Sequence, residues 1–181
     1  MRHFSNLTAL LATIALTTMC AGTALADGSS ALKNALITTM KLTSYHMTLI
    51  TPEQGTVEAD VINPGRMHMS MKNMEIIVVN QSMYMKQDGA WKKYPIDDDL
   101  YMQTDPFKRL AADAGTYTVD DLGMKVVGGT PLHAYRSTSL KTHHVSTLYL
   151  DAGDRIVRIE SGTMAMTMSK FGEAVSIVAP M

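Results

Sequence analysis

The chain has 181 residues with 16 basic and 17 acidic side chains, giving a formal net charge of −1 at pH 7. Binding along a nucleic-acid backbone needs clustered lysine and arginine, and the sequence has no such cluster, so we expect no nucleic-acid partner. The length corresponds to one domain that can bury its own hydrophobic core. Methionine is strongly enriched, with 16 residues, whereas cysteine occurs once.

The first 26 residues have the pattern of a secretory signal peptide. Arg2 lies in a short polar segment, residues 7–19 are mostly apolar, and Ala24-Leu25-Ala26 matches the small-x-small pattern before a signal-peptidase site. The apolar stretch is shorter than a membrane-spanning helix requires. We therefore expect cleavage after Ala26, a soluble periplasmic protein, and a single domain over residues 27–181.

The one cysteine, Cys20, lies inside this segment and raises the question of a lipidated N-terminus. A lipoprotein cleavage site has a small residue before the cysteine, whereas this chain has Met19, which argues against lipidation without settling it. After cleavage at Ala26 the chain has no thiol, so in an oxidising compartment its fold must depend on core packing rather than on disulfides.

Residues 30–42 are predicted to form one amphipathic helix. Ser30 is a favourable N-cap, and Leu32, Leu36 and Met40 follow at helical spacing, so a single apolar stripe runs along the helix. An isolated stripe of this kind needs a partner surface. We expect the helix to lie on a sheet.

Short alternating segments separated by turn residues follow the helix. Turns are indicated by Asn63-Pro64-Gly65 and by Asp88-Gly89, among others. The pattern predicts a meander of antiparallel hairpins. The predicted strands are residues 45–51, 56–62, 66–72, 75–79 and 83–86.

Alternation stops between residues 96 and 114, where two short helices are predicted. Asp97-Asp98-Asp99 and Asp105-Pro106 both resemble helix starts, because acidic side chains favour the positive end of a helix dipole and proline favours the first turn. Strands resume afterwards and form a second meander. Its predicted strands are residues 116–119, 123–127, 132–139, 143–151, 155–161, 163–169 and 174–178.

Many of the methionines recur at every second position within predicted strands. Successive strand side chains point to opposite faces, so each run places its methionines on one face of the sheet. If the strands belong to one curved sheet, these methionines share its concave side. Methionine is flexible and adapts to irregular partners, which favours a ligand cavity over a filled core. The runs are Met67, Met69 and Met71; Met83 and Met85; and Met164, Met166 and Met168.

Several local motifs span nearly the whole predicted mature chain. They are Asn63-Pro64-Gly65-Arg66, Met83-Tyr84-Met85 leading to residues 88–93, Leu148-Tyr149-Leu150-Asp151 leading to residues 155–158, and the closing segment 171–180. With the order of helix, meander, helical interruption and second meander, these motifs resemble the LolA-like superfamily. That superfamily includes outer-membrane lipoprotein carriers, mycobacterial lipid-binding lipoproteins and the sensor domain of a sigma-factor regulator.

The resemblance implies an α+β fold: a curved antiparallel sheet forming an unclosed half-barrel, covered by the N-terminal helix and short lid helices. It implies a monomeric, non-catalytic carrier or sensor that holds lipid or lipoprotein acyl chains and meets a membrane-bound donor or acceptor protein. Arg66 is the nearest candidate in chain order for the carriers' lid-contacting arginine, but alternation places it opposite the methionines. The implied ligand-binding residues are Met67, Met69, Met71, Met83, Met85, Leu100, Met102, Phe107, Leu110, Met164, Met166 and Met168.

Two other function classes remain open alternatives. Thioethers are soft ligands, so the methionine rows could bind periplasmic Cu(I), yet alternation sends His68 to the face opposite Met67 and Met69. We therefore predict no metal site and no cofactor. Enzyme motifs such as Gly-x-Ser-x-Gly, His-Glu-x-x-His or a phosphate-binding glycine loop are absent from the sequence, which argues against catalysis.

Overall fold

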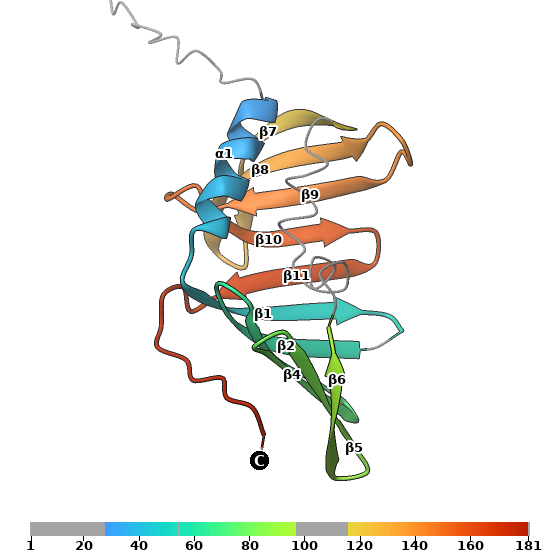
Figure 1. Ribbon diagram of the computed structural model, residues 1–181. Helices are drawn as coiled ribbons and strands as arrows, with labels where there is room; N and C mark the ends of the chain where they lie inside the picture. The colour runs from blue at the N-terminus through green and yellow to red at the C-terminus, as the bar shows by residue number, and fades with distance from the viewer. Residues whose placement is uncertain (1–27, 54, 97–115, 181) are drawn as a thin grey trace, which may run out of the picture.

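The computed structural model describes residues 28–53, 55–96 and 116–180, which form one helix and one eleven-stranded antiparallel sheet (Figure 1). The elements are α1 (Gly28–Met40), β1 (Ser44–Thr51), β2 (Gly55–Ile62), β3 (Arg66–Met71), β4 (Met74–Val79), β5 (Ser82–Gln87), β6 (Ala90–Pro95), β7 (Tyr117–Val127), β8 (Thr130–Ser139), β9 (Val145–Leu150), β10 (Ile156–Ser161) and β11 (Met164–Ser169).

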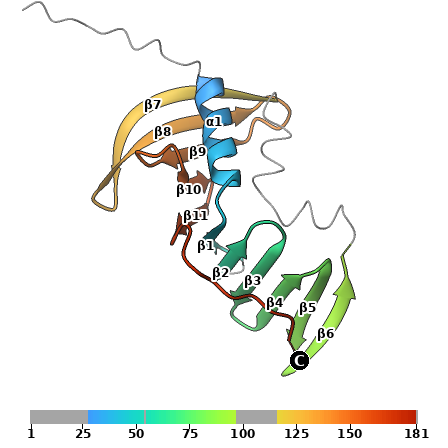
Figure 2. The ribbon, with the colours of Figure 1, turned by 60° about the vertical axis from the view of Figure 1, so that its left-hand side comes forward.

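Two meanders make up the sheet, in the order β6-β5-β4-β3-β2-β1-β11-β10-β9-β8-β7. Within each meander, neighbours in sequence are neighbours in space, and the pairing of β1 with β11 joins the two. The end strands β6 and β7 do not pair with each other, so the sheet curls without closing (Figure 2). The predicted unclosed antiparallel half-barrel is confirmed.

Helix α1 packs on one face of the sheet, against the half that contains β7 to β11 (Figures 1 and 2). Leu32 and Leu36 are buried in one cluster with Leu148 and Ile156. The hydroxyl of Thr39 donates to the carbonyl of Ala35 at 2.8 Å and accepts from the backbone N–H of Ile156 at 3.0 Å. The pairing of β9 with β10 shifts register next to Ile156, so the second bond gives the Ile156 amide a partner there. The same bond ties the helix to the sheet.

The helix begins earlier than the N-cap pattern predicts. It starts at Gly28 rather than after Ser30. A Cβ atom at residue 28 would lie 2.9 Å from the carbonyl oxygen of Val119, so only glycine allows the first turn to approach β7 this closely. The contact with β7 explains why the prediction was wrong at this end.

The segments predicted as strands 116–119 and 123–127 form one strand, β7, which bends at a bulge between Asp121 and Gly123. Gly123 has a φ of 67°, and its N–H donates to the Asp121 carboxylate at 2.7 Å. The glycine therefore marks a bulge within a strand rather than a break between two strands.

The strand predicted at residues 174–178 does not form. Both hydrogen-bonding edges of β11 are already occupied by β1 and β10, and the chain turns away after Ser169. The turn is held by Ser44, whose carbonyl accepts from Gly172 N–H at 2.9 Å and whose hydroxyl donates to the Glu173 carbonyl at 2.7 Å. Ile177 is nevertheless buried, so this segment packs on the molecule without joining the sheet.

Strand β6 was absent from the predicted strands. It carries lysines at positions 92 and 93, which are common on exposed edge strands but weaken an alternation signal. The short helices predicted between residues 96 and 114 fall almost entirely on residues outside the described part of the chain, and they remain a prediction.

Candidate groove on the methionine face

The strand register places the predicted methionines of the described strands on one face of the sheet. Met168 lies opposite Met47, which lies opposite Ala59, and Ala59 lies opposite Met69. Met69 then lies opposite Ile76, and Ile76 opposite Met85. Directly opposed residues of an antiparallel sheet share a face. We call this the methionine face; α1 packs on it, since the helix and Met47 belong to one buried cluster.

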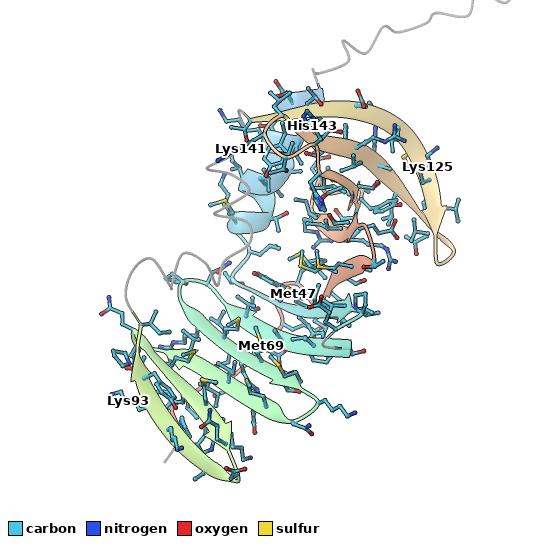
Figure 3. The ribbon with its side chains drawn as sticks, turned by 90° about the vertical axis from the view of Figure 1, so that its right-hand side faces the viewer. Met47, Met69, Lys93, Lys125, Lys141 and His143 are labelled. Atoms are coloured by element: carbon cyan, nitrogen blue, oxygen red, sulfur yellow. The ribbon has the colours of Figure 1, made fainter. Side chains whose placement is uncertain are left out.

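These methionines differ in burial along the face. Met168 is 3% exposed and Met67 is also buried, whereas Met164 is 43% exposed. The other predicted methionines of β3, β5 and β11 are partly exposed. In Figure 3, Met47 lies on β1 where the two meanders meet, and Met69 lies on β3 within the other half of the sheet.

An open groove of about 350 Å³ lies on this face, over strands β1 and β7 to β11. Its apolar lining comes from Leu49, Leu148, Ile159, Met164 and Met166. Of the predicted ligand-binding residues that lie in the described part of the chain, Met164 and Met166 line it and the others do not. The methionines of β3 and β5 lie farther along the same face, and Met168 is buried near the helix. The four predicted lid residues, Leu100, Met102, Phe107 and Leu110, lie outside the described residues.

A continuous apolar row crosses the groove from strand to strand. Each member lies opposite the next in the register, and together they span six neighbouring strands, or about 24 Å at the usual strand spacing of about 4.8 Å. Four members, on β9, β10, β11 and β1, line the groove over about 14 Å, which is close to the roughly 15 Å that one layer of acyl chains occupies in a bilayer. The two end members, Tyr135 and Val57, are buried and do not line the groove. The members of this apolar row are Tyr135, Leu148, Ile159, Met166, Leu49 and Val57.

One end of the groove is lined by hydroxyl groups that sequence reasoning missed. Ser137, Ser146 and Ser161 come from β8, β9 and β10. The Ser146 and Ser161 hydroxyl oxygens are 2.8 Å apart, and the Ser161 hydroxyl is in close hydrogen-bond contact with Nε2 of His144. Ser137 lies opposite Ser146 in the register. The available signal was serine at strand positions that alternation assigns to the buried face.

The opposite face of the sheet is charged and hydrogen-bonded. His46 on β1 contacts Asp60 at 2.8 Å and Glu58 at 2.7 Å, and its pKa is raised, chiefly by the hydrogen bond to Asp60. A carboxylate oxygen of Glu75 lies 2.9 Å from Nε2 of His68. The pKa of Glu75 is lowered, mainly by the hydrogen bond with Lys86 and to a smaller extent by the one with His68. The predicted separation of His68 from the methionine rows is confirmed.

The described residues contain no cluster of three or more His, Cys, Asp or Glu side chains arranged to bind a metal ion. None of their helices is both long and apolar enough to cross a membrane. Arg66 is exposed at the start of β3, where it pairs with Ile62 rather than with a residue of the methionine face. The alternative of Cu(I) bound by methionine thioethers involves none of these four residue types, and it stays a prediction.

No protein-family model and no curated protein matches the chain. Solved structures do. The structure is similar to lipoprotein LppX of Mycobacterium tuberculosis, with a TM-score of 0.63 and 16% identity over 83% of this chain and 98% of that one. It is also similar to LprF of Mycobacterium bovis, with a TM-score of 0.62 and 19% identity over 84% and 96%. The chain has a LolA-like fold.

A third similar structure is the MucA/MucB complex of Pseudomonas aeruginosa, with a TM-score of 0.54 and 13% identity. The match covers 83% of this chain but 59% of that one, so the similar region is part of a longer chain there. At such low identities the LolA-like fold is what the three structures share with this protein. The ligand has to be argued from the groove itself.

Proposed function

We propose that the protein is a non-catalytic periplasmic carrier or sensor that binds lipid or lipoprotein acyl chains along the methionine face. The observation that carries this proposal is the open groove crossed by the apolar row. The groove leaves the partly exposed side chains of Leu49, Ile159 and Met166 and the exposed Met164 open to water, and apolar surface of this kind favours a ligand that covers it. The LolA-like fold supports the same function class, and the secretory pattern of residues 1–26 supports the compartment.

In this proposal the acyl chain lies across the strands, along Leu148, Ile159, Met166 and Leu49. These residues share one face and come from consecutive strands of the sheet. The half-buried methionines of β3 and β5 extend the surface beyond the groove and adapt to chains of different shape. A membrane-bound donor or acceptor would load or unload the ligand.

The first experiment is native mass spectrometry of the protein purified from its own compartment, before and after extraction with organic solvent. We expect an excess mass that disappears on extraction and resolves into acylated species. A bare protein that instead takes up Cu(I) at integer stoichiometry would move the assignment to a thioether metal site.

The groove is then tested by mutation with the uncharged apolar dye Nile red. Met166→Glu places a carboxylate among apolar side chains and should weaken dye binding by more than about tenfold, because burying a charge without a partner costs several kcal/mol. Met124→Glu is the matched control, since Met124 is 62% exposed and does not line the groove. Both variants should keep the wild-type circular dichroism spectrum.

Met69→Glu measures how far the binding surface extends. A loss of affinity in Met69→Glu would place the ligand across β3 as well, whereas wild-type affinity would confine it to the groove over β1 and β7 to β11. If Met166→Glu binds Nile red as tightly as the wild type, the groove is not the binding site.

A further inference from the structure

The hydroxyl-lined end of the groove adds specificity to the proposed function. We propose that Ser137, Ser146 and Ser161 form a subsite for an uncharged, hydrogen-bonding lipid head, such as the ester and hydroxyl groups of an acylglycerol. This inference rests on the proposed function, because it assigns the polar end of a ligand whose acyl chains occupy the apolar row. We call the three serines the hydroxyl row.

Ser137 is the strongest reason to place a polar ligand group here. Its side chain is 2% exposed and lines the groove, and its buried hydroxyl oxygen has no hydrogen-bond partner among the described residues. A buried hydroxyl without a partner costs about 1–3 kcal/mol. A ligand oxygen that accepts from this hydroxyl would recover that cost on binding.

The neighbouring hydroxyls supply the complementary group. A serine hydroxyl has one donor and two acceptor positions. Ser146 and Ser161 share one hydrogen bond, and Ser161 is also bonded to His144, which leaves acceptor capacity on Ser146. Ser137 and Ser146 lie directly opposite each other in the register of β8 and β9. Together they match a head that offers both an acceptor, such as an ester carbonyl, and a donor, such as a free hydroxyl.

The position of the hydroxyl row fits an amphiphile. Each of these serines is two residues along its strand from a member of the apolar row: Ser137 from Tyr135, Ser146 from Leu148, and Ser161 from Ile159. The polar and apolar rows therefore run side by side across the same three strands. A lipid can place its acyl chain on one row while its head contacts the other.

The charges around the groove favour a neutral head. Its described lining includes no lysine, arginine, aspartate or glutamate, and its one histidine, His144, is already hydrogen-bonded to Ser161. A phosphate or carboxylate bound here would lose water without gaining an ion pair from these residues, which is unfavourable. An ester, amide or hydroxyl head loses much less hydration and can be fully satisfied by the serines.

Ser161 and His144 also resemble a nucleophile with its base, so binding must be separated from hydrolysis. A catalytic histidine is commonly oriented by a third group. No carboxylate of the described residues pairs with the Nδ1 atom of His144, and Ser161 shares its hydroxyl with Ser146. The hydroxyl row is therefore assigned to binding.

The test compares dioctanoylglycerol with dioctanoyl phosphatidic acid as competitors for bound Nile red, because the two share their acyl chains and differ by the phosphate. We expect dioctanoylglycerol to displace the dye at an at least tenfold lower concentration. In the Ser137→Ala, Ser146→Ala double variant, displacement by dioctanoylglycerol, corrected for the variant's own Nile red affinity, should weaken by about fivefold for each hydrogen bond lost. Ser70→Ala, an exposed serine of the opposite face, is the control.

Stability of the unliganded protein gives a second measurement. Ser137→Ala removes a buried hydroxyl without a partner among the described residues, so its Tm should rise by about 2–4 °C even as dioctanoylglycerol binding weakens. A purely structural serine would give a lower Tm.

Equal displacement by the two lipids, or a double variant that binds dioctanoylglycerol like the wild type, would overturn the head subsite and leave the acyl groove intact. Conversion of dioctanoylglycerol to a monoacylglycerol by the wild type would also overturn it, in favour of hydrolysis. A wild-type protein that does not bind Nile red would overturn the proposed function itself, and this inference with it.

Discussion

The two halves of the sheet carry the same alternation but differ in what packs on them. Over β7 to β11, α1 covers the strand ends and Met168 is 3% exposed. Over β2 to β6, which α1 does not cover, Met69 and Met85 are partly exposed, although they have the same spacing in sequence. Only Met67 is buried among the methionines of that half, because it packs into the helix-side cluster.

This difference shows that alternation determines the face on which a methionine lies, whereas tertiary packing determines how far it is exposed. Val57 and Val78 lie on the same face in the half that α1 does not cover, and both are buried. The groove lies on the helix-covered half, beyond the part of β9, β10 and β11 that the helix buries. One apolar face thus includes both a packed core, which contains the residues under α1, and an open groove.

The largest expected effect comes from removing a core side chain under the helix. Leu36 is 1% exposed, so Leu36→Ala should lower the free energy of unfolding by about 2–5 kcal/mol through lost burial and a cavity. Met85→Ala, in the half that α1 does not cover, should cost less than about 1 kcal/mol, since Met85 is already partly exposed. Urea unfolding of both variants measures the two values.

Similar losses for Leu36→Ala and Met85→Ala would contradict the division into core and surface. In that case both halves would have to be packed to the same extent. Either value measures stability only if the substitution shifts the urea midpoint and leaves the slope m unchanged.

Much of the fold could be predicted because it depends on local patterns. Alternation and turn residues located most strands to within one or two residues, as for β3, where the prediction of 66–72 compares with Arg66–Met71. The errors arose where tertiary contacts override local signals. Gly28 extends the helix because β7 lies against it, Gly123 is a bulge because β8 continues past it, and residues 174–178 find no free strand edge beside β11.

The site was less predictable than the fold. A spacing of two is enough to predict that the methionines of one strand share a face. Which methionines of different strands lie close together depends on how the strands pair. Met164 and Met166 line the groove, while Met71 and Met83 lie strands away from it. The hydroxyl row was missed because its three serines are distant in sequence and become neighbours only through the register of β8, β9 and β10.

Oxidation of the methionines should have an effect of intermediate size on binding. The order in which they are oxidised ranks them by exposure. Exposed thioethers become polar sulfoxides first, so mild peroxide should modify Met164 before Met168 and before Met47 under the helix. Peptide mass spectrometry reads the order. Because Met164 and Met166 line the groove, Nile red binding should fall at doses that leave Met168 reduced and the circular dichroism spectrum unchanged. Binding that survives full oxidation of these two residues would place the dye elsewhere.

The smallest effect is expected on the opposite face, where β1 joins the two halves. The pKa of His46 is raised above its ordinary value of 6.5, chiefly by the hydrogen bond to Asp60, with Glu58 adding to the rise. A raised folded pKa means that protonated His46 stabilises the fold fully below pH 6.5, and that this contribution is lost as pH increases through the folded value. Because the pair is partly exposed, the contribution should be less than about 1 kcal/mol.

His46→Gln tests this pH dependence, since glutamine keeps hydrogen-bonding capacity without the charge. The difference in unfolding free energy between wild type and variant should be largest near pH 5.5 and shrink toward pH 8.5, with Nile red binding unaffected because His46 lies on the face opposite the groove. A difference that stays constant with pH would show that the imidazole contributes packing alone. A loss of dye binding would show that the outer face of β1 is coupled to the groove.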